Sequence, residues 1–574
     1  MPQLRRSIPP SALLLLPALS LLLACGGGQG SSTAVAAGTP APAPAPRPAD
    51  REPFWATDTP IRPEVASLFG AARRPAPVVA LSAAQAAEVA EAPTPAPASA
   101  DPRPAVQTLA GQLRIVVGLR SVSYHQDSTT TLLPLHLSSL PIQALVPNSS
   151  GGYDLLTGEG HDDGTFSISG VPEGYYWLRF GSTYVWTSAS YVDWSTDQFG
   201  RSDAAYAGTS PTALSFSLTD LAPWQGTDEL VYDAPNEGTA FSLPLGSADI
   251  TNAPSVGATA LAGFSLNLAG NDLFFPLPDA TKGDQVYLDQ LTTRTASGEA
   301  YRALARTYVA PAFTMTDGTA SNLSGGFLDV PQAAALRLNW HRSAFQAFAP
   351  GVHPSAAVAG SYLFTYAYPL PSTYGLPFNA FQLLDYTSAG TGDVDLGDLP
   401  YGNPFPAAWS VAVESYQGFT LSYLAPGATT PVTLTRYAYQ ASTSLPTAAA
   451  PVTPLLGPIQ APKINGKDLF ANQVSVGTTP TLSWGAPALG PVSGYVVTCY
   501  QLSASGTAST LQNVARFRTR TTSIKLPSGV LNPGSTYVFT VAAIRANGVD
   551  LASTPFRTAL PYAFVTSMSG IVAP

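Results

Sequence analysis

The side chains best suited to catalysis are few in this chain and widely spaced. The sequence contains two cysteines, Cys25 and Cys499, and five histidines, which are His125, His136, His161, His341 and His353. A serine hydrolase of the α/β type would show a G-x-S-x-G turn and a zincin the motif H-E-x-x-H, and the chain has neither. Because histidines far apart in sequence can still meet in a fold, this weakens an enzymatic function without excluding it.

Two further features contain residues that could act as chemical sites, but their sequence context favours a structural role. The stretch GTGDVDLGDLPYGN brings Asp393, Asp395 and Asp398 close together, and calcium prefers oxygen ligands of this kind. The stretch lacks the spacing and the terminal glutamate of a full calcium-binding loop, so we interpret it as a solvated turn. Cys499 alternates with apolar residues, which predicts a buried and unreactive thiol. We therefore expect no catalytic residue, no metal and no cofactor.

The stretch YYWLRFGSTYVWTSASYVDW is the richest in side chains suited to binding. If Tyr176 and the alternate residues after it face a core, strand alternation places Tyr175, Trp177 and Arg179 on the outer face. Exposed Tyr and Trp are common binding anchors, and flat rings beside an arginine suit a sugar or a protein loop. We favour the alternative that the rings pack against the central region, because domains of one chain often cover each other's faces.

The N-terminal stretch RRSIPPSALLLLPALSLLLACGGG has the order of a secretory signal. Its apolar run, Ala12 to Ala24, is about 13 residues, shorter than the ~20 that a membrane-spanning helix needs. Leu22-Leu23-Ala24-Cys25 resembles the lipobox of bacterial lipoproteins. The resemblance implies cleavage before Cys25 and lipid on its thiol, and Gly26 implies sorting to the outer membrane. The alternative is an ordinary signal peptide, cut near Ala24, with Cys25 unmodified.

Composition sets the remaining limits. The chain has 574 residues, and only 11% are charged, against about 25% in ordinary soluble proteins. The net charge of −9 gives no broad basic surface, so we expect no nucleic acid as a partner. Residues 25–108 contain proline-alanine tracts such as GTPAPAPAPRPAD, which favour an extended, disordered stalk.

Residues 109–212 are typical of short strands joined by tight turns. In DDGTFSISGVPEGYYWLRF, Asp163-Gly164 indicates a hairpin, and Val171-Pro172-Glu173-Gly174 indicates a second turn. This segment resembles the transthyretin-like (carboxypeptidase regulatory-like) β-sandwich. The resemblance implies no catalytic residues, because that module is an accessory domain in the enzymes that contain it.

Residues 213–440 contain strand-like runs without a constant repeat, which fit one large sandwich or two smaller ones. The best helix candidate is SGEAYRALARTYV, from Ser297 to Val309. A linker follows at 441–460. Residues 461–574 then resemble a fibronectin type III domain. The resemblance places in its core, or in a tyrosine corner, the residues Trp484, Tyr495, Val497, Cys499, Leu531, Pro533, Tyr537, Phe539, Val541 and Ala543.

These observations predict an all-β chain: a signal peptide at 1–24, a disordered stalk, and tandem β-sandwich domains. We expect a non-catalytic protein held at the cell outer membrane by lipid on Cys25, on its periplasmic or surface face. It would present its domains to an envelope protein or a glycan. The alternatives are a glycan-active hydrolase with its site in 213–440, which would need two carboxylates in one cleft, and a purely structural envelope component.

Overall fold

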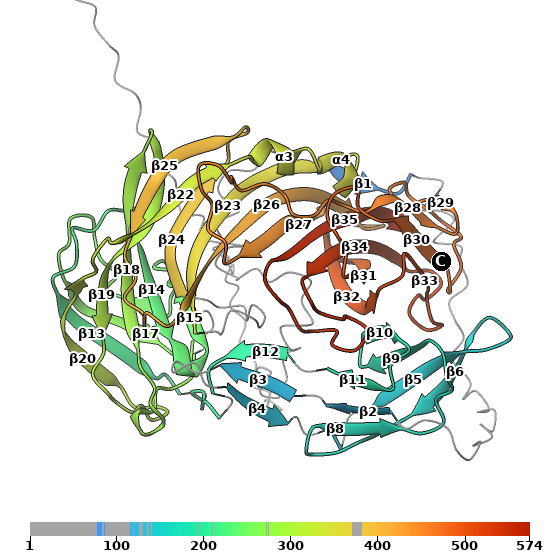
Figure 1. Cartoon of the computed structure of the whole chain (residues 1–574), viewed down its shortest axis with the longest axis horizontal. Helices are drawn as coiled ribbons and strands as arrows, with labels where there is room; N and C mark the ends of the chain where they lie inside the picture. The colour runs from blue at the N-terminus through green and yellow to red at the C-terminus, as the bar shows by residue number, and fades with distance from the viewer. Residues whose placement is uncertain are drawn as a thin grey trace, which may run out of the picture. The chain divides into compact units, whose positions relative to one another are not determined.

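The structure is a computed structural model. It describes residues 77–82, 85, 115–118, 120–124, 130–134, 137–138, 141–194, 196–201, 203–208, 210–270, 273, 275–369 and 381–574. All of them belong to one compact unit, Pro53–Pro574. Their regular structure is almost entirely β, as the sequence predicts, and we describe it as four modules in chain order (Figure 1).

The first module, residues 115–200, consists of short strands in three sheets. One sheet has the order β11-β2-β8-β7, another has the order β12-β3-β4, and β5, β6, β9 and β10 belong to a third, larger sheet. The predicted hairpin is confirmed, because Gly164 has a φ of 79° between β7 and β8. Its strands are β2 (Ile115–Gly118), β3 (Arg120–Tyr124), β4 (Thr130–Pro134), β5 (Ile142–Pro147), β6 (Tyr153–Thr157), β7 (Glu159–Gly160), β8 (Thr165–Ile168), β9 (Tyr176–Phe180), β10 (Thr183–Thr187), β11 (Tyr191–Asp193) and β12 (Thr196–Phe199).

The second module, residues 213–329, encloses a core between two layers. The sheet β16-β17-β13-β20 supplies residues such as Phe216 and Phe264, and β14, β18 and β19 supply others such as Leu288 and Tyr308. The elements are β13 (Ala213–Thr219), β14 (Glu229–Ala234), η3 (Pro235–Glu237), β15 (Thr239–Ser242), β16 (Ile250–Thr251), β17 (Leu261–Asn267), η4 (Ala280–Lys282), β18 (Tyr287–Ala296), β19 (Glu299–Val309), β20 (Ser321–Gly326) and β21 (Leu328–Asp329).

The helix predicted over Ser297–Val309 is wrong. Residues Glu299–Val309 form strand β19, which pairs with β18 along its whole length. Ser297 and Gly298, with φ of 49° and 84°, make the two-residue hairpin turn between the strands. Positive φ at both central positions is the geometry that matches the twist of paired strands, so this turn directs the chain back along β18.

The third module, residues 334–442, joins the second through a short pairing of β19 with β24. It contains β22 (Ala334–Trp340), α3 (Arg342–Gln346), α4 (Ala349–Val352), β23 (Ala357–Tyr368), β24 (Phe381–Ser388), β25 (Val394–Tyr401), β26 (Ser410–Leu424) and β27 (Val432–Ser442). The helices are short, and no helix within the described ranges is long and apolar enough to span a membrane.

The C-terminal module, residues 460–572, has the two facing sheets expected of it. One sheet has the order β29-β28-β30-β33, and β31, β32, β34 and β35 form the other layer. Its strands are β28 (Gln460–Ile464), β29 (Lys467–Asp468), β30 (Thr481–Gly485), β31 (Gly494–Ser505), β32 (Ala508–Thr519), β33 (Ser523–Lys525), β34 (Thr536–Ala546) and β35 (Tyr562–Val572).

The core predicted for the C-terminal module is confirmed. Trp484 packs edge-on against Tyr495, with 5.3 Å between ring centroids. The Tyr537 hydroxyl accepts a 2.8 Å hydrogen bond from the Asn532 backbone N–H, which closes the tyrosine corner. Cys499 is fully buried, and burial raises the pKa of its thiol well above the ordinary value, so this thiol is unreactive.

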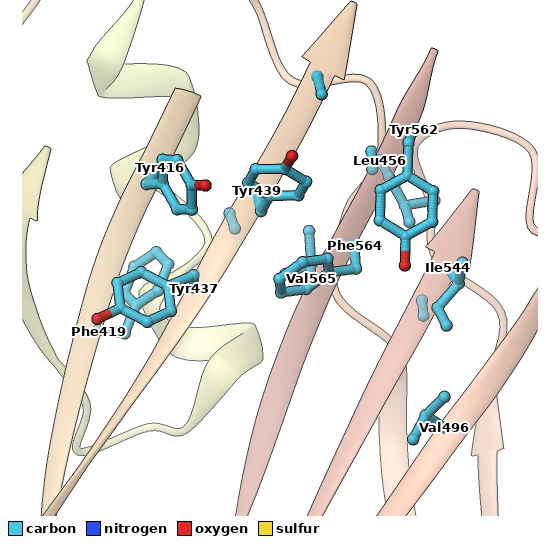
Figure 2. Packing of buried hydrophobic residues seen from close by; sticks show 14 of the residues in the cluster. Tyr416, Phe419, Tyr437, Tyr439, Leu456, Val496, Ile544, Tyr562, Phe564 and Val565 are labelled. Atoms are coloured by element: carbon cyan, nitrogen blue, oxygen red, sulfur yellow. The ribbon is translucent and has the colours of Figure 1, made fainter. Parts of the chain in front are cut away.

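The third and C-terminal modules share one hydrophobic core. Strand β27 pairs with β35, and the strands carry Tyr439 and Phe564, whose ring centroids lie 5.0 Å apart. Figure 2 shows these two rings beside Tyr416 on β26 and Val565 on β35. The joined strands belong to a single 18-stranded sheet that also takes in parts of the first two modules.

Most N-terminal predictions lie outside the described residues. These are the signal peptide at 1–24, the lipidation of Cys25 and most of the stalk at 25–108. Within the stalk, however, Val78–Ala80 form strand β1, which pairs in parallel with Ser422–Leu424 of β26. The expected disorder is therefore wrong for this short piece, because its backbone pairs with a strand edge of the third module.

Candidate binding surface

Strands β9 and β10 carry most of the aromatic residues singled out from the sequence and pair as an antiparallel hairpin, and Tyr175 directly precedes β9. Tyr176 and Leu178 face the core of the first module, as predicted. Trp177 faces the other side of the sheet, as alternation predicts, but is only 1% exposed, so it cannot serve as an exposed binding anchor. A neighbouring module covers it, which is the kind of packing favoured above, although the partner is the C-terminal module instead of the central region.

Trp177 lies at the centre of a contact between the first and C-terminal modules. Its ring meets Phe517 on β32 edge-on at 5.4 Å, and Tyr184 stacks on the same phenylalanine at 4.7 Å. The indole N–H donates to the Tyr153 hydroxyl over 3.2 Å, so the buried polar atom is satisfied. Strand β10 also pairs in parallel with β32. We call this contact, made by Trp177, Tyr184 and Phe517, the aromatic joint.

Arg179 is held within the first module. Its guanidinium lies 5.2 Å from the centroid of the Tyr184 ring, a cation–π geometry. Its Nε donates to the Gly181 carbonyl over 3.0 Å, and another guanidinium nitrogen donates to the Gln143 side chain over 3.2 Å. The arginine therefore braces the turn after β9 and the aromatic joint.

Tyr175 is the one predicted binding residue that is well exposed, at 55%. Its ring stacks on Trp186 of β10 with 5.7 Å between centroids and 14° between planes. Trp186, which is half-buried, contacts Trp177 at 4.9 Å. Tyr175 and Trp186 thus form a flat aromatic surface supported from below, which we call the aromatic platform. Trp186 belongs to the aromatic stretch noted above, but strand alternation alone does not show that it stacks on Tyr175, because the two rings come from neighbouring parts of the hairpin.

A second contact between modules is built from charges. Arg302 on β19 contacts Glu229 on β14 at 2.8 Å and Asp385 on β24 at 3.0 Å. Gln382 donates to Asp385 over 2.7 Å. Burial raises the pKa of Asp385, and the facing Arg302 opposes that rise. We call this contact, made by Glu229, Arg302 and Asp385, the ionic joint.

The hydrolase alternative requires paired carboxylates, and Asp233 and Asp289 form one such pair within residues 213–440. Burial raises the pKa of Asp289 to about 7, while its interactions with Thr307 and Asp233 oppose the rise. Both aspartates are fully buried, so neither can contact a substrate in this structure. Glu414 is likewise enclosed, because the hydroxyls of Tyr368 and Tyr416 both donate to it. These carboxyl groups are therefore enclosed within the folded core and do not line an open cleft.

Several of the remaining candidates have structural partners of their own. Asp393 accepts hydrogen bonds from the backbone and hydroxyl of Ser343, whereas Asp395 pairs with Arg337 at 2.7 Å. Among the described residues, no group of three His, Cys, Asp or Glu side chains could hold a metal ion. His353 is buried against the Phe470 carbonyl, and His125 and His136 lie outside the described residues.

Comparison with known proteins identifies one module. Residues 470–559 match the family model of the fibronectin type III domain. The C-terminal module is therefore fibronectin type III-like, as its motifs predicted. The match covers too little of the chain to assign the whole protein to a family. Strands β28, β29 and β35 lie outside the matched residues.

Comparisons of the whole chain add little. No curated protein matches this sequence. A tandem-repeat structure from the extending region of a large adhesion protein is 12% identical, covers 79% of this chain and 99% of its own, and has a TM-score of 0.10. A mutant Salmonella alpha-2-macroglobulin is 14% identical, covers 80% of this chain and 29% of its own, and has a TM-score of 0.11. Scores this low carry no argument about fold or function.

Proposed function

We propose that this protein is a non-catalytic lipoprotein of the cell outer membrane that uses its β-modules to bind an envelope protein or a glycan. The single observation that carries the binding part is the aromatic platform. An exposed ring that already stacks on a supported tryptophan loses little conformational freedom when it binds, and therefore suits recognition. The lipobox-like sequence at Cys25 supports the anchored part. In the lipoproteins it resembles, the amino terminus of the cysteine is usually acylated as well as the thiol, and two lipid signals make anchoring stable.

The finer features of the chain belong to the same proposal. The first module acts as a transthyretin-like accessory domain, in keeping with its two tight turns and its exposed platform. The fibronectin type III-like module packs against it through the aromatic joint. This contact holds the platform on a fixed support instead of on a loose loop. A binding role needs only such a fixed surface, whereas hydrolysis would need accessible carboxylates, and the Asp233–Asp289 pair is buried.

The binding part is tested by replacing Tyr175 with alanine and screening the purified mature chain on a glycan array and against envelope extract. We expect loss of a ligand that the unchanged protein captures, because about half of this ring is available for contact. Tyr191→Ala is the matched control, since Tyr191 is 50% exposed on β11 of the same module. Equal binding by both variants would refute the platform, and failure to capture any ligand would favour a purely structural role.

The anchored part is tested separately. Mass spectrometry of the mature protein should find acyl mass on Cys25, and the protein should fractionate with outer membranes. Cys25→Ser should release the protein into the soluble fraction. An unacylated Cys25 in the native chain would refute the anchor while leaving the platform open to its own test.

A further inference from the structure

Strand β1 is an isolated piece of the predicted stalk that lies against the folded modules (Figure 1). Val78, Val79 and Ala80 pair in parallel with Ser422, Tyr423 and Leu424 of β26. The Ser422 backbone N–H donates to the Pro77 carbonyl over 2.7 Å. The stalk segment is therefore held by strand pairing, which satisfies backbone groups on both sides.

The edge that β1 occupies is the part of β26 that β23 does not reach. Strand β23 pairs with β26 from Ser410 to Thr420, and the pairing ends at Ala357. On its other side, β26 stays paired with β27 as far as Tyr423. An unpaired strand edge is a template for pairing with another extended segment. Residues Pro77–Ala80 fill this place.

Side-chain burial follows the same docking. Val79 and Leu81 pack against the main hydrophobic core, whereas Val78, between Pro77 and Val79, is 53% exposed. This is the alternation of a strand with one face on a protein surface. The segment thus contributes apolar contacts on one face as well as backbone pairing.

Asn472, in the fibronectin type III-like module, fixes the end of β1. Its Oδ1 accepts a hydrogen bond from the Ile571 backbone N–H over 2.8 Å, so its Nδ2 is turned the other way. That Nδ2 donates to the Ala80 carbonyl over 2.6 Å. The Asn472 carbonyl also accepts a hydrogen bond from the Gln85 side chain over 3.5 Å. One asparagine therefore links the stalk segment to the last strand of the chain.

We propose that the β26 edge and Asn472 form a strand-binding site whose occupant is segment 77–82 of this chain, and that this docking sets where the lipid anchor joins the folded part. The chain between Cys25 and Pro77 then serves as the tether to the membrane. The inferred position of the anchor rests on the proposed lipidation of Cys25. The docking of segment 77–82 does not.

Hydrogen exchange of the full mature chain with Cys25→Ser tests the docking without lipid. Those amides in 78–81 that point toward β26 should exchange at least tenfold more slowly than amides of an unstructured chain. Val79→Asp should abolish this protection and expose the Ser422 amide, which donates to the Pro77 carbonyl. Val78→Asp, at the exposed neighbour, is the matched control. Equal exchange in the two variants, or unprotected amides in the unchanged segment, would overturn the proposal.

Asn472→Asp isolates the asparagine link. The aspartate keeps an oxygen for the Ile571 N–H and loses the donor to Ala80, so exchange in 78–81 should rise severalfold while β35 stays protected. Unchanged exchange in 78–81 would remove Asn472 from the proposal. Loss of protection in β35 as well would show that Asn472 supports the module as a whole and not the stalk segment in particular.

Energy transfer on vesicles tests the position of the anchor. Single dyes are placed by Pro426→Cys, near the end of β26, and by Glu173→Cys, in the first module; Cys499 is buried and stays unlabelled. With an acceptor on the lipid headgroups, transfer from position 426 should exceed transfer from 173, and Val79→Asp should reverse the order. Stronger transfer from position 173 than from position 426 in the protein that keeps Val79 would overturn the proposal. A protein that never binds vesicles would instead refute the lipid anchor, while the exchange result would stand.

Discussion

The two joints connect modules by opposite means. The aromatic joint packs Trp177, Tyr184 and Phe517 with a parallel pairing of β10 and β32. The ionic joint sets Arg302 between Glu229 and Asp385 beside an antiparallel pairing of β19 and β24. Both extend the same 18-stranded sheet, so the strand ladder crosses a boundary equally well with either set of side chains.

Because one joint is apolar and the other is charged, the two should respond differently to substitution, salt and pH. The stabilisation gained from apolar contact is roughly proportional to the apolar area that is buried, and it involves no charged group whose state depends on pH. A buried ion pair repays its desolvation only while both partners are present and charged, and it fails sharply when one is removed. We therefore expect the aromatic joint to be sensitive to side-chain volume and the ionic joint to charge.

The largest effect should come from Trp177→Ala, because it removes the ring at the centre of the aromatic joint. Truncating a buried tryptophan costs about 3–5 kcal/mol, so we expect a loss of that order in the free energy of unfolding. Urea unfolding followed by fluorescence and circular dichroism measures it. Tyr175→Ala, on the exposed side of the same hairpin, should cost well under about 1 kcal/mol. Similar losses in the two variants would mean that Trp177 is not a core residue.

Arg302→Leu should come next, with a loss of about 3 kcal/mol, because Glu229 and Asp385 would remain buried without a cation. The matched control is Arg306→Leu on the same strand. Arg306 pairs with Asp329, whose side chain is 82% exposed, and such surface pairs contribute about 0–1 kcal/mol. Unfolding at two salt concentrations provides the measurement. A loss at Arg302 no larger than that at Arg306 would show that the ionic joint contributes little.

The smallest effect concerns pH and the carboxyl pair on β14 and β18. Asp289 has a pKa of about 7 in the folded chain and an ordinary value of 3.8 when unfolded, so the folded state holds its proton more tightly. Its stabilising contribution is present below pH 3.8 and is lost as pH rises through about 7. Asp289→Asn should flatten the fall in unfolding free energy between pH 4 and 8, as measured by urea titrations. A variant with the same pH dependence as the parent would contradict this.

Two errors of sequence interpretation both concern segments that turn out to be paired strands. In Ser297–Val309 the run of Ala, Arg and Leu favours a helix by propensity, but Ser297-Gly298 turns the chain back against β18. The Ser-Gly pair is a turn signal that was present in the sequence, and weighing it above propensity would have predicted the hairpin. The stalk error has a tertiary cause instead, because Val78–Ala80 become a strand only when the distant β26 edge pairs with them.

Trp177 teaches a different lesson about faces. Alternation correctly placed it opposite Tyr176 and Leu178, but alternation tells which residues share a face and not what covers that face. Phe517 covers it, from more than three hundred positions later in the chain. A hairpin with large apolar side chains on both faces was the signal that something covers the second one.

Local chemistry determined much of this protein by itself. Turn residues, period-two alternation and the motifs around Trp484 and Tyr537 fixed the β class and the fibronectin type III-like module, since these depend on contacts within one module. Only the tertiary structure decided that Trp177 is buried, that Tyr175 and Trp186 form a platform, and that a piece of the stalk is a strand. Each of these depends on a surface supplied by a distant part of the chain, and a local pattern carries no information about which surface that is.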